Sequence, residues 1–108
     1  KGMRPMQTVL AALIGCSSVD VVSILKKQRQ DYTSFKIEVD GNREAGKEPS
    51  LWENVELTFL FEGTVDAGKA YRAAELSIEK YCSVAATLRK AGADIRFKVI
   101  VNNQEYKP

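Results

Sequence analysis

The chain opens on a long apolar stretch with the periodicity of an α-helix. From Pro5 to about residue 28, apolar side chains recur at spacings of three and four and form two adjacent stripes. Because these stripes leave little of the circumference polar, we expect this helix to be covered from more than one side. The first stripe contains Val9, Leu13, Cys16 and Asp20, and the second contains Leu10, Ile14, Val21 and Leu25.

Farther along the chain, apolar and polar residues alternate in three segments, which is the pattern of strands with one buried face. These predicted strands cover residues 35–40, 55–61 and 95–101. Between the second and the third, Asp66 is placed to cap a helix over residues 67–80. Ser83 is placed to cap a further short helix that stops at Gly92.

These elements predict one α+β domain over residues 1–108, in the main order helix, strand, strand, helix, strand. Three strands and one amphipathic helix cannot enclose a first helix that is apolar nearly all round. We therefore expect further strands or a partner chain to supply the missing cover.

The composition is that of an ordinary globular domain, with 44% hydrophobic and 28% charged residues. A formal net charge of +2 without a dense basic block predicts no nucleic acid partner. Polar residues interrupt the first apolar stretch, which favours a buried helix of a soluble protein over a membrane span. No cleavage site follows the basic start, so we expect no signal peptide and a cytoplasmic location.

The candidate chemistry lies in two cysteines, Cys16 and Cys82, because the sequence contains no histidine. They are too far apart for a C-x-x-C pair and too few for a zinc shell, so we expect neither a metal nor a cofactor. From the pattern alone, Cys16 also fits a small apolar core residue, since free cysteine is often buried. Cys82 lies just before the helix start predicted at Ser83, where the helix N-terminus favours a thiolate.

Asp20 lies one helical turn after Cys16, where its negative charge opposes formation of a thiolate. A reactive Cys16 therefore requires a cation that outweighs this carboxylate. The candidates in the sequence are Arg4, Arg72 and Lys80.

Both cysteines lie in motifs with long flanks. The first motif is GMRPM at residues 2–6, LAALIGC at 10–16 and DVVSILKK at 20–27, and the second is LSIEKYCSV at 76–84. With these motifs the chain resembles the OsmC/Ohr family of osmotically inducible and organic hydroperoxide resistance proteins over nearly its whole length. Hydroperoxide resistance proteins have a glutamate at the position of Met6. The chain is thus more similar to the OsmC-like branch.

The resemblance implies an intertwined homodimer in which long central helices are wrapped by antiparallel sheet. Family members begin with additional strands that carry an activating arginine, and we expect such strands to be missing before Lys1. The resemblance also implies a thiol peroxidase that reduces organic hydroperoxides. Cys16 matches the peroxidatic cysteine and Cys82 the resolving cysteine, and a lipoyl-like dithiol would reopen the disulfide between them.

Two hypotheses of function follow. In the first, the protein is a cysteine-based peroxidase acting on apolar hydroperoxides through Cys16 and Cys82. In the second, it is a non-catalytic dimeric binding or stress-response module in which Cys16 is an unactivated, buried thiol. The rate at which Cys16 is alkylated in the native protein separates the two hypotheses.

Overall fold

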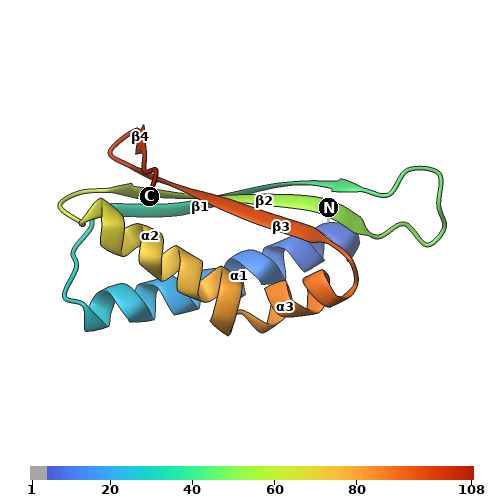
Figure 1. The fold of residues 1–108 in the computed structure, drawn as a ribbon, viewed down its shortest axis with the longest axis horizontal. Coiled ribbons are helices and arrows are strands. Elements are labelled where there is room, and N and C mark those ends of the chain that lie inside the picture. Colours follow the sequence, from blue (N-terminus) through green and yellow to red (C-terminus); the bar gives the residue numbers. More distant parts are fainter. Residues whose placement is uncertain (1–4) are drawn as a thin grey trace.

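The computed structural model describes residues 5–108. Three long strands and three helices form two layers, with a short π-helical turn between the second and third helices (Figure 1). The elements are α1 (Pro5–Lys27), β1 (Ser34–Arg43), β2 (Trp52–Glu62), α2 (Ala67–Leu76), η1 (Ser77–Tyr81), α3 (Ser83–Lys90), β3 (Asp94–Val101) and β4 (Gln104–Glu105). The predicted α+β class is confirmed.

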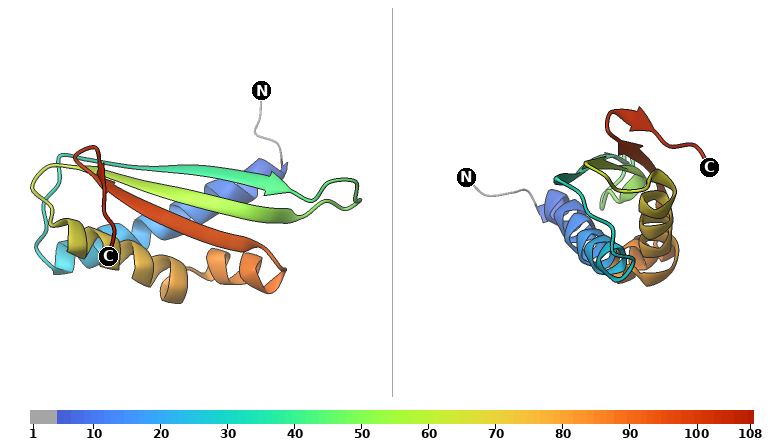
Figure 2. Two further views of the ribbon diagram at one scale, coloured as in Figure 1. Left: turned by 45° about the horizontal axis from the view of Figure 1, so that its top comes forward. Right: turned by 90° about the vertical axis from the view of Figure 1, so that its left-hand side faces the viewer.

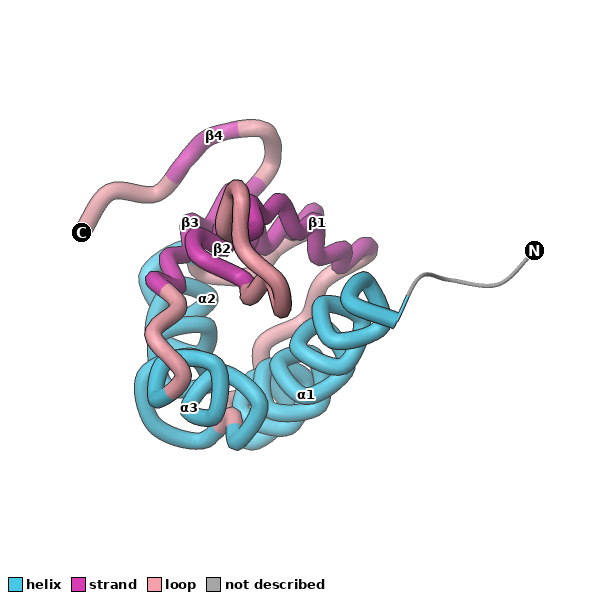
Figure 3. The backbone as a smooth tube through the Cα atoms, turned by 90° about the vertical axis from the view of Figure 1, so that its right-hand side faces the viewer, coloured by secondary structure: helices cyan, strands magenta, loops and turns pink. Residues whose placement is uncertain are grey.

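The strands form one sheet in the order β1-β2-β3-β4, and all three helices cover the same face of it (Figure 1, Figure 3). β1 pairs with β2 and β3 with β4 in antiparallel fashion, whereas β2 and β3 are parallel. The prediction of an antiparallel sheet is therefore confirmed for two of the three strand pairings and wrong for β2 with β3. The chain crosses from the end of β2 through α2 and α3 before it enters β3, and such a crossover returns a strand in its original direction.

The core lies between the sheet and the helices, as the alternation of the strands predicts. In β2, every second side chain from Val55 to Phe61 is buried. Its apolar partners in β1 and β3 point to the same face, because paired residues share one side of a sheet. The pairs are Phe35 with Phe61, Ile37 with Phe59, Val39 with Leu57, Val55 with Ile95, Leu57 with Phe97, Phe59 with Val99 and Phe61 with Val101.

The first helix forms almost as predicted, but only one side of it is covered. Its buried residues are Leu10, Leu13, Ser17, Val21 and Leu25, which contact α2, η1, α3 and β1. On the other side, Val19 is 70% and Val22 41% exposed. The expected cover on more than one side is thus not provided within the described residues.

The predicted helix over 67–80 ends at Leu76 and continues as the π-helical turn η1. The N–H of Cys82 bonds to the carbonyl of Ser77, five residues earlier, at 2.7 Å. The predicted cap at Ser83 is wrong by one residue: Cys82 is the N-cap of α3, and its Sγ accepts from the N–H of Ala85 at 3.4 Å. A thiol takes the place of the usual hydroxyl cap.

The strand β4 was not predicted. Asn102 and Asn103 have positive φ angles of 50° and 68°, which allow a tight turn that folds the chain back on β3 (Figure 2). At the other end of the sheet, the loop between β1 and β2 projects past the helical layer (Figure 2). Both features lie away from the helices that carry the cysteines.

The predicted cap of α2 is confirmed, because the carboxylate of Asp66 accepts from the N–H of Lys69 at 2.9 Å. We expect Asp66→Ala to lower the free energy of unfolding by about 1 kcal/mol, since a backbone donor loses its partner. Urea unfolding measures the change. Ser83→Ala is the control, because Cys82 and not Ser83 caps α3. Equal stability of Asp66→Ala and the parent chain would contradict this role of Asp66.

Candidate functional site

The fold brings the two cysteines together from separate helices. Cys16 lies in the middle of α1, and Cys82 lies at the junction between η1 and α3. Their side chains lie close enough to interact, and both are free thiols in this structure. Two groups far apart in the sequence thus share one site beneath the sheet.

The two thiols differ in their access to solvent. Cys16 is half-buried, whereas Cys82 is only 2% exposed. Around the Cys82 sulfur, the N–H of Ala85 donates at 3.4 Å, and the Ser17 hydroxyl lies 3.9 Å away. Ser17 is fully buried and also donates to the carbonyl of Leu13 at 2.8 Å. A small reagent from solvent therefore reaches Cys16 more readily than Cys82.

Burial raises the pKa of the Cys82 thiol above its ordinary value. The neighbouring Cys16 raises this pKa further, while the N–H of Ala85 and the hydroxyl of Ser17 act in the opposite direction. The N–H of Ala85 at the start of α3 thus lowers the pKa of Cys82, as predicted for a helix N-terminus, but desolvation outweighs it and the pKa is raised overall.

Asp20 is engaged with the turn that precedes Cys82. Its Oδ2 accepts from the hydroxyl of Ser77 at 3.0 Å, and Ser77 is fully buried. Neither Ser17 nor Ser77 was predicted from the sequence as part of the site. Ser17 lies four residues from both Leu13 and Val21, on the buried side of α1. A polar residue at such a position is the signal in the sequence that could have identified it.

Two of the three cations proposed to act on Cys16 have other partners. Arg4 lies outside the described residues. Arg72 pairs with Glu75 at 2.7 Å, and the Nζ of Lys80 lies 5.5 Å from the centre of the Tyr81 ring. Both described candidates thus have partners other than Cys16.

A hollow of about 490 Å³ lies between the second half of α1 and the turn η1. Ile24, Leu76 and Tyr81 give it apolar walls, while Asp20 and Lys27 contribute opposite charges. Neither cysteine lines this hollow; its nearest point on α1 is Asp20, one helical turn after Cys16. A smaller hollow of about 240 Å³ is lined by Cys82, together with Ile78 and Ala86.

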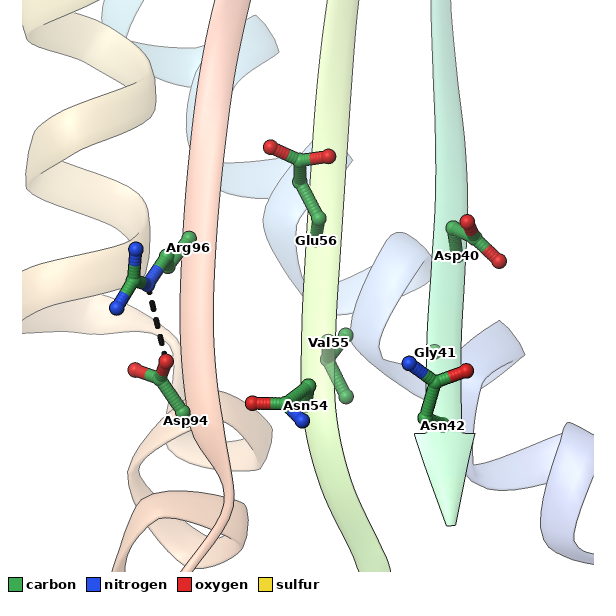
Figure 4. A pocket seen from close by; sticks show the side chains of 8 residues that line it. All are labelled: Asp40, Gly41, Asn42, Asn54, Val55, Glu56, Asp94 and Arg96. Atoms are coloured by element: carbon green, nitrogen blue, oxygen red, sulfur yellow. Dashed lines mark hydrogen bonds and ion pairs between the residues drawn. The ribbon is translucent and has the colours of Figure 1, made fainter.

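A second hollow, of about 410 Å³, lies at one end of the sheet and has a different character (Figure 4). Polar side chains from β1, β2 and β3 line it, and Arg96 is bonded to Asp94 at 2.9 Å. It contains neither cysteine. Among residues 5–108, no group of three or more His, Cys, Asp or Glu side chains is arranged to hold a metal ion.

The sequence of the chain matches the profile of the OsmC-like proteins over residues 1–98. It is also 45% identical over 93 residues to protein YhfA of Escherichia coli K12, a match that covers 84% of this chain and 68% of YhfA. The chain belongs to the OsmC-like protein family. The resemblance seen in the two cysteine motifs is thereby confirmed.

Solved structures agree with this assignment. A hypothetical protein from Aquifex aeolicus VF5 superposes with a TM-score of 0.83 and 37% identity, covering 94% of this chain and 77% of that one. The organic hydroperoxide resistance protein OhrB of Bacillus subtilis superposes with a TM-score of 0.71 over 92% of this chain and 71% of OhrB. At 18% identity, the match to OhrB shows the shared OsmC-like fold.

Family membership also bears on α1. Within the described part of the chain, this helix is long and apolar enough to cross a membrane by length and composition. In the structure it packs beside α2 and α3 beneath the sheet, as part of a fold shared with OsmC-like proteins (Figure 2). The predicted burial of the whole helix is not found in the described residues, because only one side of α1 is covered.

Proposed function

We propose that this OsmC-like protein is a thiol-dependent peroxidase that reduces organic hydroperoxides. The observation that carries the proposal is the contact between a half-buried thiol, Cys16, and a buried thiol, Cys82, across two helices. A thiol open to solvent can meet the oxidant. A second thiol in direct contact can then close a disulfide before further oxidation occurs.

The proposed cycle has three balanced steps. The Cys16 thiolate attacks the terminal oxygen of the hydroperoxide ROOH, which breaks the O–O bond, releases the alcohol ROH and leaves Cys16 as a sulfenic acid. Cys82 displaces the hydroxyl group from this sulfur, so that a Cys16–Cys82 disulfide and water form. A dithiol then exchanges with the disulfide and becomes oxidised itself, returning both cysteines to thiols.

The surroundings of the thiol pair favour apolar hydroperoxides and a dithiol reductant. The hollow that starts at Asp20, one helical turn from Cys16, has walls of Ile24, Leu76 and Tyr81, which suit an alkyl or aryl group. A dithiol of the lipoyl type completes both exchange steps within one molecule. We place the reaction in the cytoplasm, where thiol reductants keep cysteines reduced.

The test is consumption of cumene hydroperoxide by the purified chain with dihydrolipoamide as reductant. We expect hydroperoxide-dependent oxidation of the dithiol, faster with cumene hydroperoxide than with hydrogen peroxide. A rate no greater than that of the dithiol without protein overturns the proposal.

We further propose that two copies of the chain associate through the exposed side of α1. This side presents small and apolar residues where a soluble protein normally presents polar ones: Ala11, Ala12, Gly15, Val19 and Val22. Burying them against a second copy would supply the cover that the described residues of one chain do not.

Val19→Ala is expected to weaken this homodimer about tenfold, because the lost methyl groups count once in each copy. Sedimentation across a concentration series measures the dissociation constant. Leu51→Ala is the matched control, since Leu51 is 42% exposed but lies next to β2 and far from α1 in the sequence. A monomeric parent chain, or equal dissociation constants for Val19→Ala and the parent, would rule out this interface.

A second candidate function is a non-catalytic dimeric module. The raised pKa of Cys82 favours it, because a protonated resolving thiol is a weak nucleophile. In that case Cys16 also reacts slowly with iodoacetamide in the native protein. Rapid modification of Cys16 near neutral pH decides for the peroxidase.

A further inference from the structure

A second contact joins the helix of Cys16 to the turn before Cys82. The hydroxyl of Ser77 donates to Oδ2 of Asp20 at 3.0 Å. Ser77 is fully buried at the first position of η1, and Asp20 lies one turn after Cys16 on α1. Hydrogen bonds from a hydroxyl to a carboxylate are among the stronger ones in proteins, and more so when shielded from water.

The same serine also holds the backbone of Cys82. The carbonyl of Ser77 accepts from the N–H of Cys82 at 2.7 Å, which is the bond that closes the π-helical turn. Ser77 therefore binds α1 with its side chain and Cys82 with its main chain. Ser77 thus links the position of Cys82 to α1, the helix that carries Cys16.

The π-helical geometry explains why such a connection matters. A π turn contains one residue more than an α turn and forms mostly as a single turn within α-helices. If the turn reverted to α-helical bonding, the following residue would rotate by about 100° around the helix axis. A rotation of that size at Cys82 would carry its sulfur away from Cys16.

We propose that Asp20 and Ser77 are a positioning pair that fixes the π turn against α1 and so holds Cys82 within reach of Cys16 for disulfide closure. This role rests on the resolving step of the proposed function. It also accounts for Asp20, whose negative charge opposes a thiolate at Cys16. The carboxylate of Asp20 acts instead on the position of Cys82.

The test measures the Cys16–Cys82 disulfide by itself, without any hydroperoxide. The protein is oxidised with diamide and equilibrated in dithiothreitol buffers of varied redox ratio, and the disulfide fraction is read by thiol trapping and mass. We expect Ser77→Ala to lower the equilibrium constant for disulfide formation about tenfold, as expected for one lost charge-assisted hydrogen bond. Asp20→Asn keeps an amide oxygen as acceptor and is expected to lower it less.

Two comparisons separate positioning from a general loss of structure. Ser18→Ala removes a serine hydroxyl of α1 that donates to the carbonyl of Gly15 at 3.0 Å and takes no part in the bond between Asp20 and Ser77. We expect this variant to keep the equilibrium constant of the parent chain. In a cycle of Asp20→Ala, Ser77→Ala and the double variant, the double variant is expected to match the single ones, because both remove the same bond. If Ser77→Ala does not fold, the two Asp20 variants carry the test.

An unchanged disulfide equilibrium in Ser77→Ala or in Asp20→Ala overturns the positioning role, as does a parent chain that forms no disulfide with diamide. A failure of the positioning pair can be told apart from a failure of the peroxidase proposal. A chain that forms the disulfide and loses it in Ser77→Ala, yet consumes no hydroperoxide, supports the positioning pair and refutes the peroxidase. A chain that consumes hydroperoxide at the parent rate in both Ser77→Ala and Asp20→Ala refutes the positioning pair and supports the peroxidase.

Discussion

Cys16→Ser is expected to abolish hydroperoxide turnover, whereas Cys82→Ser is expected to retain one turnover per chain. The serine hydroxyl at position 16 neither attacks a peroxide bond at neutral pH nor stores the oxidising equivalent as a sulfenic acid. Cys82 cannot substitute for it, because the Cys82 side chain is 2% exposed and its pKa is raised by burial. The loss therefore reaches the rate of the dithiol alone.

Intact mass after one equivalent of cumene hydroperoxide distinguishes the two thiols. We expect the parent chain to lose two hydrogens as the disulfide forms. In Cys82→Ser, the sulfenic acid of Cys16 persists and is trapped by dimedone. In Cys16→Ser, the mass stays unchanged. Turnover by Cys16→Ser at the parent rate would falsify the assigned role, and full multiple turnover by Cys82→Ser would show that the second thiol is dispensable.

Much of the fold could be predicted because the pattern that defines each element is local. The strands alternate with period two, since one face of each contacts the helices, and residues 55–61 show this alternation in their burial as well. The first helix was placed almost to the residue by its spacing and by Pro5. Parallel pairing of β2 and β3 depends instead on the crossover through two helices, which no strand pattern records.

The geometry around Cys82 could not be predicted from local sequence. Residues Ser77–Tyr81 continue the helical pattern of α2, and the extra residue of the π turn coincides with the contact between Ser77 and Asp20 on another helix. Whether the helix N-terminus or burial controls a thiol depends on what packs over it. For Cys82, burial is the largest cause of the raised pKa, and Cys16 of α1 adds to it. Tertiary contacts thus set the properties of the site that the motifs located.

The disulfide-forming step is expected to accelerate with rising pH. Cys82 attacks the oxidised Cys16 as a thiolate, and burial together with Cys16 raises the pKa of Cys82. Below that pKa the thiolate is a small fraction that grows about tenfold with each pH unit, so the closing rate should grow in proportion. Quenched single turnovers between about pH 6 and pH 8 measure this rate as the appearance of the disulfide.

The Cys82→Ser chain supplies the control, because it reports the oxidation of Cys16 without closure. Dividing the cycle in this way assigns the pH dependence to one thiol. If closure in the parent chain is independent of pH over the range, Cys82 already reacts as a thiolate, and desolvation does not control it. If closure follows the pH while oxidation of Cys16 in Cys82→Ser does not, titration of the buried thiol accounts for the pH dependence of closure. Burial would then slow disulfide closure at neutral pH while it shields the Cys82 sulfur from solvent.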